Sequence, residues 1–206
     1  NDSFGYKLAT GDLNADGKVD LAVGASGYST QTGRVYIFYG DSSIDISTST
    51  ADTTITGETT DNYFGTSLTI GDLNADGETD LVVGSRYSTN VGRAYIFYND
   101  GSYTTAAGSA DVIFSGEASS YFGVSLTTGD LNADGETDLG TFPTNFFFII
   151  IAKYVLSLRI TIFLVCIHAL VGRGCLLIRW TTLRRTKRWQ WSSGMRQKTP
   201  LIYISL

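Results

Sequence analysis

Short apolar stretches alternate with polar, glycine-rich segments along the first 140 residues of the chain. In the first repeat of this pattern the apolar stretches occupy residues 19–26, 33–40 and 53–58, and a shorter one at 4–8 precedes them. They are rich in Val, Ile, Tyr and Phe, and Gly, Asn and Asp separate them, which is typical of short β-strands. The pattern therefore predicts about four strands in each 60 residues.

The same order of segments recurs, so the chain is a tandem repeat. A phrase that begins with Phe-Gly and ends with Gly-Asp-Leu-Asn-Ala-Asp-Gly starts at Phe4, Phe64 and Phe122. The run 35–39 (VYIFY) lacks polar alternation, which indicates a strand buried on both faces. Four strands per repeat, arranged radially, make the blade of a β-propeller. We predict an all-β fold of such blades.

A nine-residue loop of the form D-x-N-x-D-G-x-x-D ends each Phe-Gly phrase. In calcium loops, positions 1, 3 and 5 give side-chain oxygens and position 7 gives a backbone carbonyl. The glycine at position 6 allows the sharp turn, and the aspartate at position 9 can close the site. The predicted calcium ligands are Asp12, Asn14, Asp16, Lys18 (carbonyl) and Asp20; Asp72, Asn74, Asp76, Glu78 (carbonyl) and Asp80; and Asp130, Asn132, Asp134, Glu136 (carbonyl) and Asp138.

Two other interpretations of the loops are an EF-hand and a polar turn that binds nothing. An EF-hand needs a glutamate at position 12 and flanking helices, but position 12 is Val23 in the first loop and Val83 in the second. A polar turn that binds nothing is the second alternative, because Asp, Asn and Gly favour turns. Three loops with one set of oxygen donors favour calcium over both.

These motifs resemble the FG-GAP repeats of integrin alpha subunits. The resemblance rests on Phe4-Gly5, Gly24-Ala25, the aspartate loop and the phrase GRVYIF at 33–38, and it covers about residues 1–140. It implies blades of a seven-repeat propeller, with calcium in the loops of one face as a structural ion. The opposite face would bind a protein or glycan ligand, and a true integrin would add a second subunit. Ser26 stands where the family motif has proline.

The repeats divide the chain into predicted domains at 1–58, 59–117 and 118–140, the third a truncated blade, followed by a tail at 141–206. A propeller needs about four to eight blades to close. Two blades and the start of a third are too few, and the chain begins within a motif. We therefore expect a fragment of a longer repeat array.

The repeat pattern stops after Leu139, and the charge changes there. Residues 1–140 hold five basic and twenty acidic residues, a net charge of −15, whereas residues 141–206 hold ten basic residues and no acidic one. Three hypotheses for the tail stay open. The first is a membrane segment at 146–172, interrupted by Lys153 and Arg159. The second is a basic tail that contacts lipid or nucleic acid. The third is a non-native read-through sequence.

The sequence gives no support for catalysis, because the only histidine, His168, lies in an apolar run without a paired nucleophile. The acidic charge of the repeats argues against nucleic acid as their partner. Weak calcium loops suit millimolar calcium, so we expect an extracellular or cell-surface location, with membrane anchoring if the tail spans. The predicted function is a non-enzymatic role in adhesion or recognition. The alternatives are an accessory propeller of a secreted hydrolase, such as a glycolipid-anchor phospholipase D, and a structural surface repeat protein.

Overall fold

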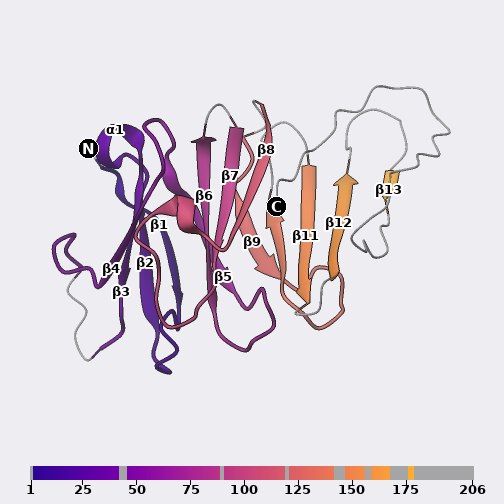
Figure 1. Cartoon of the computed structure of the whole chain (residues 1–206), viewed down its shortest axis with the longest axis horizontal. Helices are drawn as coiled ribbons and strands as arrows, with labels where there is room; N and C mark the ends of the chain where they lie inside the picture. Colours follow the sequence, from indigo (N-terminus) through magenta and orange to yellow (C-terminus); the bar gives the residue numbers. More distant parts are fainter. Residues whose placement is uncertain are drawn as a thin grey trace.

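The computed structural model describes residues 2–41, 46–88, 91–118, 121–141, 147–155, 159–167 and 176–178. Two antiparallel four-stranded sheets follow one another along the chain, which confirms the predicted all-β fold with blade-like sheets (Figure 1). The first has the order β1-β2-β3-β4, and a short helical segment, α1, joins its second and third strands. The bounds are β1 (Phe4–Gly11), β2 (Asp20–Ala25), α1 (Tyr28–Gln31), β3 (Arg34–Phe38) and β4 (Thr53–Thr56).

The second sheet repeats the first in strand order and in register. Leu8 of the first strand faces Val23, and in the second sheet Leu68 faces Val83. Both sheets have an irregularity just after the Phe-Gly pair, so the local bend recurs as well. The elements are β5 (Phe64–Gly71), β6 (Asp80–Ser88), β7 (Val91–Phe97), the 3-10 helix η1 (Ala107–Ser109) and β8 (Val112–Ala118).

The third repeat contributes one pair of strands, after which the chain enters a different sheet. Within the predicted apolar segment 146–172 the structure places two paired strands. The bounds are β9 (Leu126–Gly129) and β10 (Asp138–Thr141), then β11 (Phe147–Val155), β12 (Arg159–Ile167) and β13 (Leu176–Ile178). Among the residues that the structure describes, no helix has the length and apolar character to cross a membrane.

The phenylalanine of each Phe-Gly pair packs on two aromatic side chains of the third strand in its sheet. Phe64 is fully buried and meets the rings of Tyr95 and Phe97 edge-on, at centroid distances of 5.2 and 6.3 Å. Phe4 meets Tyr36 and Phe38 in the same way. Val35 to Phe38 are all buried, which confirms burial of this strand on both faces. Edge-to-face packing of this kind adds to the free energy gained by burying the rings.

Glycines make the contact between consecutive repeats. A Cβ atom at Gly24 would collide with the carbonyl oxygen of Gly65, and one at Gly65 would lie 2.9 Å from the carbonyl oxygen of Arg34. The next boundary repeats this contact between Gly84 and Gly123. In the second and third repeats, the glycine of the Phe-Gly pair therefore meets the first glycine of the Gly-Ala or Gly-Ser motif in the preceding repeat. Both backbones approach closely because neither glycine carries a side chain.

We predict that replacing the packed glycine is more destabilising than replacing its open counterpart. Gly5 and Gly65 occupy the same motif position with φ of 84° and 86°, but nothing lies within 4 Å of a Cβ at Gly5. Gly5→Ala should lower the free energy of unfolding by about 1–2 kcal/mol through backbone strain. Gly65→Ala should cause the same loss and lower the free energy of unfolding by about 1–3 kcal/mol more, because the added methyl group collides with the neighbouring repeat. Urea denaturation of the two variants measures the difference; equal losses would contradict a role in repeat packing.

Candidate functional site

The three aspartate loops have one backbone conformation. The first, second and third loops are residues 12–20, 72–80 and 130–138. The predicted positive φ of the position-6 glycine is confirmed at Gly17 (82°), and the other two loops agree. The alanine two residues before it, which the sequence analysis did not single out, is also left-handed, with φ of 60° at Ala15. Alanine rarely adopts this region, so its recurrence at Ala75 and Ala133 indicates a geometry imposed by the loop.

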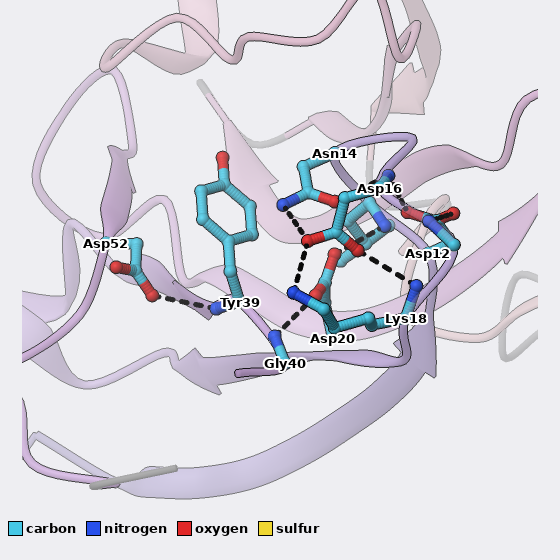
Figure 2. A network of polar contacts seen from close by, with 10 residues as sticks. Asp12, Asn14, Asp16, Lys18, Asp20, Tyr39, Gly40 and Asp52 are labelled. Carbon is cyan, nitrogen blue, oxygen red and sulfur yellow. Dashed lines mark hydrogen bonds and ion pairs between the residues drawn. The ribbon is translucent and has the colours of Figure 1, made fainter. Parts of the chain in front are cut away.

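In the first loop, hydrogen bonds draw three side chains together (Figure 2). Asp12 accepts the backbone N–H groups of Asp16 and Gly17 at 3.1 and 2.7 Å. Asn14 Oδ1 lies 3.1 Å from the same Asp16 nitrogen. Asp16 in turn accepts the N–H of Lys18 at 2.9 Å and the amide of Asn14 at 3.2 Å. The oxygens at positions 1 and 3 therefore converge on one nitrogen, and the carboxylate at position 5 lies beside the amide of position 3.

The other two loops use the same backbone hydrogen bonds, with one difference in the third. Asp72 and Asp130 each accept the N–H groups four and five residues ahead, as Asp12 does. In the second loop the position-3 amide of Asn74 donates to Asp76 at 2.7 Å. In the third loop Asn132 instead donates to Asp138 at 3.3 Å. The position-3 side chain of the third loop is thus turned toward position 9.

In the first two loops, the aspartate at position 9 is buried and ties its loop to its own sheet. Asp20 accepts the N–H of Leu13 at 2.7 Å with one oxygen and the N–H of Gly40 at 2.6 Å with the other (Figure 2). Asp80 makes the equivalent bonds to Leu73 and Asn99. The loop sequence predicts only a closing ligand at this position. Its role as a brace between the loop and the end of the third strand emerges from the structure.

The pKa values of exposed and buried carboxyl groups in the loops are shifted in opposite directions. Burial raises the pKa of Asp80 to about 6, although the N–H groups of Leu73 and Asn99 oppose that rise; Asp76 and Asp72 add to it. The pKa of Asp138 is also raised, again chiefly by burial. By contrast, the pKa of the exposed Asp16 is lowered, mainly by the N–H of Lys18. In the second and third loops, burial therefore makes the charged form of the position-9 carboxyl group costly.

The donors of these loops fit a hard divalent cation in chemistry and in proximity. Carboxylate, amide and carbonyl oxygens are the ligands that calcium prefers. Asp12 Oδ1 and Asn14 Oδ1 lie 3.1 Å from one nitrogen, so these donors already converge. Across the described ranges, no three His, Cys, Asp or Glu side chains group closely enough to hold a metal by themselves. A cation here would accordingly depend on the asparagine and the position-7 carbonyl as well.

A second recurring aspartate, which the sequence analysis did not single out, accepts a backbone hydrogen bond beside the first and second loops. Asp52 accepts the N–H of Tyr39 at 2.7 Å, and Asp111 accepts the N–H of Tyr98 at 2.8 Å. The signal that could have found them is an Ala-Asp pair repeated 59 residues apart, at 51–52 and 110–111. Both aspartates belong to the scaffold that surrounds the loops.

Comparison with known proteins gives one family and two groups of relatives. The family model described as "FG-GAP repeat" matches residues 4–38 and 64–97. Phosphatidylinositol-glycan-specific phospholipase D of Rattus norvegicus is 34% identical over 150 residues, which cover 66% of this chain and 18% of that protein. Integrin alpha-PS2 of Drosophila melanogaster is 31% identical over 150 residues, covering 67% of this chain and 10% of that protein.

A shorter match to integrin alpha-X of Mus musculus is 42% identical over 87 residues, covering 40% of this chain and 7% of that protein. The chain spans less than a fifth of the length of the curated relatives it matches. The similarity to both groups of relatives is therefore a similarity of the repeat region.

We predict that two aspartates of the first loop respond differently to substitution in calcium-free protein. Asp20→Ala should lower the free energy of unfolding by about 3 kcal/mol or more, because it leaves the buried N–H groups of Leu13 and Gly40 without acceptors. Asp16→Ala should have a much smaller effect, since Asp16 is exposed to solvent. Urea denaturation in chelator measures both; a larger loss for Asp16→Ala would contradict the bracing role of Asp20.

Proposed function

Because residues 4–38 and 64–97 are FG-GAP repeats, we propose that the chain is part of a calcium-stabilised β-propeller for extracellular adhesion or recognition. The observation that carries the proposal is the recurrence of one loop geometry, with the same oxygen donors, in three successive repeats. In each copy the loop joins the first two strands of its sheet, so the three loops have equivalent places in the repeat (Figure 1). The loops would serve as structural metal sites.

In the first loop the proposed ligands are the side chains of Asp12, Asn14 and Asp16, the carbonyl of Lys18, and Asp20. The equivalent residues serve in the second and third loops. Asp20 accepts one N–H on each carboxylate oxygen. A carboxylate has about four lone-pair sites, so it has acceptor capacity left for a cation. When bound, calcium would neutralise carboxylates that otherwise repel one another within one turn.

The opposite end of the sheets is the proposed recognition face. Two arginine–aromatic stacks lie near the ends of strands away from the aspartate loops: Arg34 lies 3.8 Å from the ring centroid of Tyr28, and Arg86 lies 4.7 Å from that of Tyr63. Such stacks hold large side chains in fixed positions at a surface. A protein or glycan ligand, and a second subunit in an integrin-like assembly, would bind there. Millimolar calcium outside cells suits single-loop sites.

An accessory role in a secreted hydrolase is the second proposal, because relatives named phosphatidylinositol-glycan-specific phospholipase D match the same region of the chain. In that setting too, the repeats would act as a non-catalytic scaffold. The loop aspartates are hydrogen-bonded to backbone N–H groups of their own loops. His168, the only histidine, lies outside the described residues.

We expect calcium to raise the melting temperature of the protein relative to chelator. A ligand that binds only the folded state, at a hundred times its Kd, adds about 2.7 kcal/mol of stability. Calorimetric titration of Asp76→Ala should lose one class of sites, whereas Asp2→Ala, the same change at an exposed position outside the loops, should titrate like the parent. Equal melting temperatures with calcium and chelator would overturn the metal assignment.

We also expect no hydrolase activity from this chain. Incubation with vesicles that carry a glycolipid-anchored reporter enzyme should release no more reporter than buffer does, with or without calcium. An added phosphatidylinositol-specific phospholipase serves as the positive control. Release by the chain itself would refute the non-catalytic role and favour the hydrolase proposal in a stronger form.

A further inference from the structure

Asn99 bonds to the aspartate loops of two different repeats. It follows β7 and is almost fully buried, with 3% of its surface exposed. Its backbone N–H donates at 3.0 Å to Oδ1 of Asp80, and Asp80 is the position-9 aspartate that braces the second loop. Its side-chain Nδ2 donates at 3.3 Å to the carbonyl oxygen of Asp12, which is position 1 of the first loop. One residue therefore joins two loops that lie 60 residues apart in sequence.

The side-chain half of this link is particular to Asn99. The equivalent position of the first repeat is Gly40, whose backbone N–H donates to Asp20 as that of Asn99 does to Asp80. Glycine has no side chain with which to reach a neighbouring repeat. Asn99 Oδ1 accepts the N–H of Gly101 at 3.2 Å, which leaves the Nδ2 donor for the Asp12 carbonyl. The amide is thus held in the orientation that the link requires.

The surroundings of this link have little access to water. The phenol of Tyr103 has its pKa raised by burial, and then by the nearby charge of Asp80, with Tyr39 and Asp20 adding to it. The hydroxyl of Tyr103 is buried without a hydrogen-bond partner among the described residues, and Asn99 and Asp80 are themselves buried. Hydrogen bonds in such a setting are stronger than in water. A displacement of the backbone at one end of the link that Asn99 makes therefore affects the loop at its other end.

We propose that Asn99 is a positioning residue that couples cation binding at the first and second loops. The inference rests on the proposed function, since it presumes that both loops bind calcium. A cation held by the second loop fixes Asp80, and through it the backbone of Asn99. The amide of Asn99 then holds the Asp12 carbonyl, which orders the start of the first loop before its own cation arrives. Each site should strengthen the other.

The test is a calorimetric calcium titration of the full chain in an Asp134→Ala background, which leaves the first and second loops as the titrating sites. Adding Asp76→Ala removes the second site and should weaken calcium binding at the first by about fivefold, the lower end of typical coupling between sites. Adding Asp16→Ala instead should weaken the second site by the same factor, because coupling of binding free energies is reciprocal. In Asn99→Ala protein neither removal should change the affinity of the remaining site.

The matched control removes a different contact between the same repeats. Arg93 and Glu58 form an ion pair at 2.7 Å, and Arg93 lies six positions before Asn99, about 20 Å away along an extended strand. Glu58→Ala should leave the coupling factor unchanged. Loss of coupling in Glu58→Ala as well would show that general packing of the repeats carries it, and would overturn the role of Asn99.

The remaining outcomes separate this inference from the proposed function. Calcium binding at both loops with independent affinities in the parent, or coupling that persists in Asn99→Ala, overturns the coupling and leaves the metal sites standing. No heat of calcium binding in the parent overturns both. If Asn99→Ala fails to fold, Asn99→Gly gives the second repeat the residue of the first at this position and keeps the N–H bond to Asp80. Coupling must vanish in that variant too.

Discussion

Backbone contact through glycine sets how closely consecutive repeats pack, and the rest of the arrangement depends on it. Gly24 meets Gly65 at the first boundary, and Gly84 meets Gly123 at the second. Because no Cβ separates the backbones, the first strand of one sheet lies directly on the sheet before it. Phe64 is then fully buried, whereas Phe4, which begins the first sheet, is 37% exposed. The same spacing brings Asn99 of one repeat to the Asp12 carbonyl of another.

The first two aspartate loops divide their carboxylates between two tasks. The residues at positions 1 and 5 accept backbone N–H groups of the loop, as Asp12 and Asp16 do. The buried residue at position 9, such as Asp20, ties the loop to the end of the third strand. A buried carboxylate costs free energy unless it is hydrogen-bonded. The loop is therefore held in the one placement that lets this aspartate keep its hydrogen bonds. The loop is consequently ordered by its own backbone hydrogen bonds and by the sheet beneath it.

The repeat region of this chain is similar to regions of two different groups of proteins, and the packing of the repeats gives a physical reason. Integrin alpha chains and phosphatidylinositol-glycan-specific phospholipase D both match the repeat region. Within one repeat, strand packing, the glycine contact and the aspartate loop depend on residues of that repeat or its neighbour. A module of this kind transfers between proteins, because each unit needs only a similar unit beside it.

The sequence by itself determined the strand pattern, the repeat and the loop chemistry. Valine, isoleucine and aromatic runs such as 35–38 specify buried strands, and Gly17 specifies a left-handed turn, because these effects act between residues close in sequence. Only the tertiary structure decided that Asp20 is a buried brace and that Asn99 reaches another repeat. Those roles depend on atoms brought together from residues 20 to 87 positions apart. No local pattern contains that information, because it arises from the pairing of strands within a sheet and from the packing of one sheet on the next.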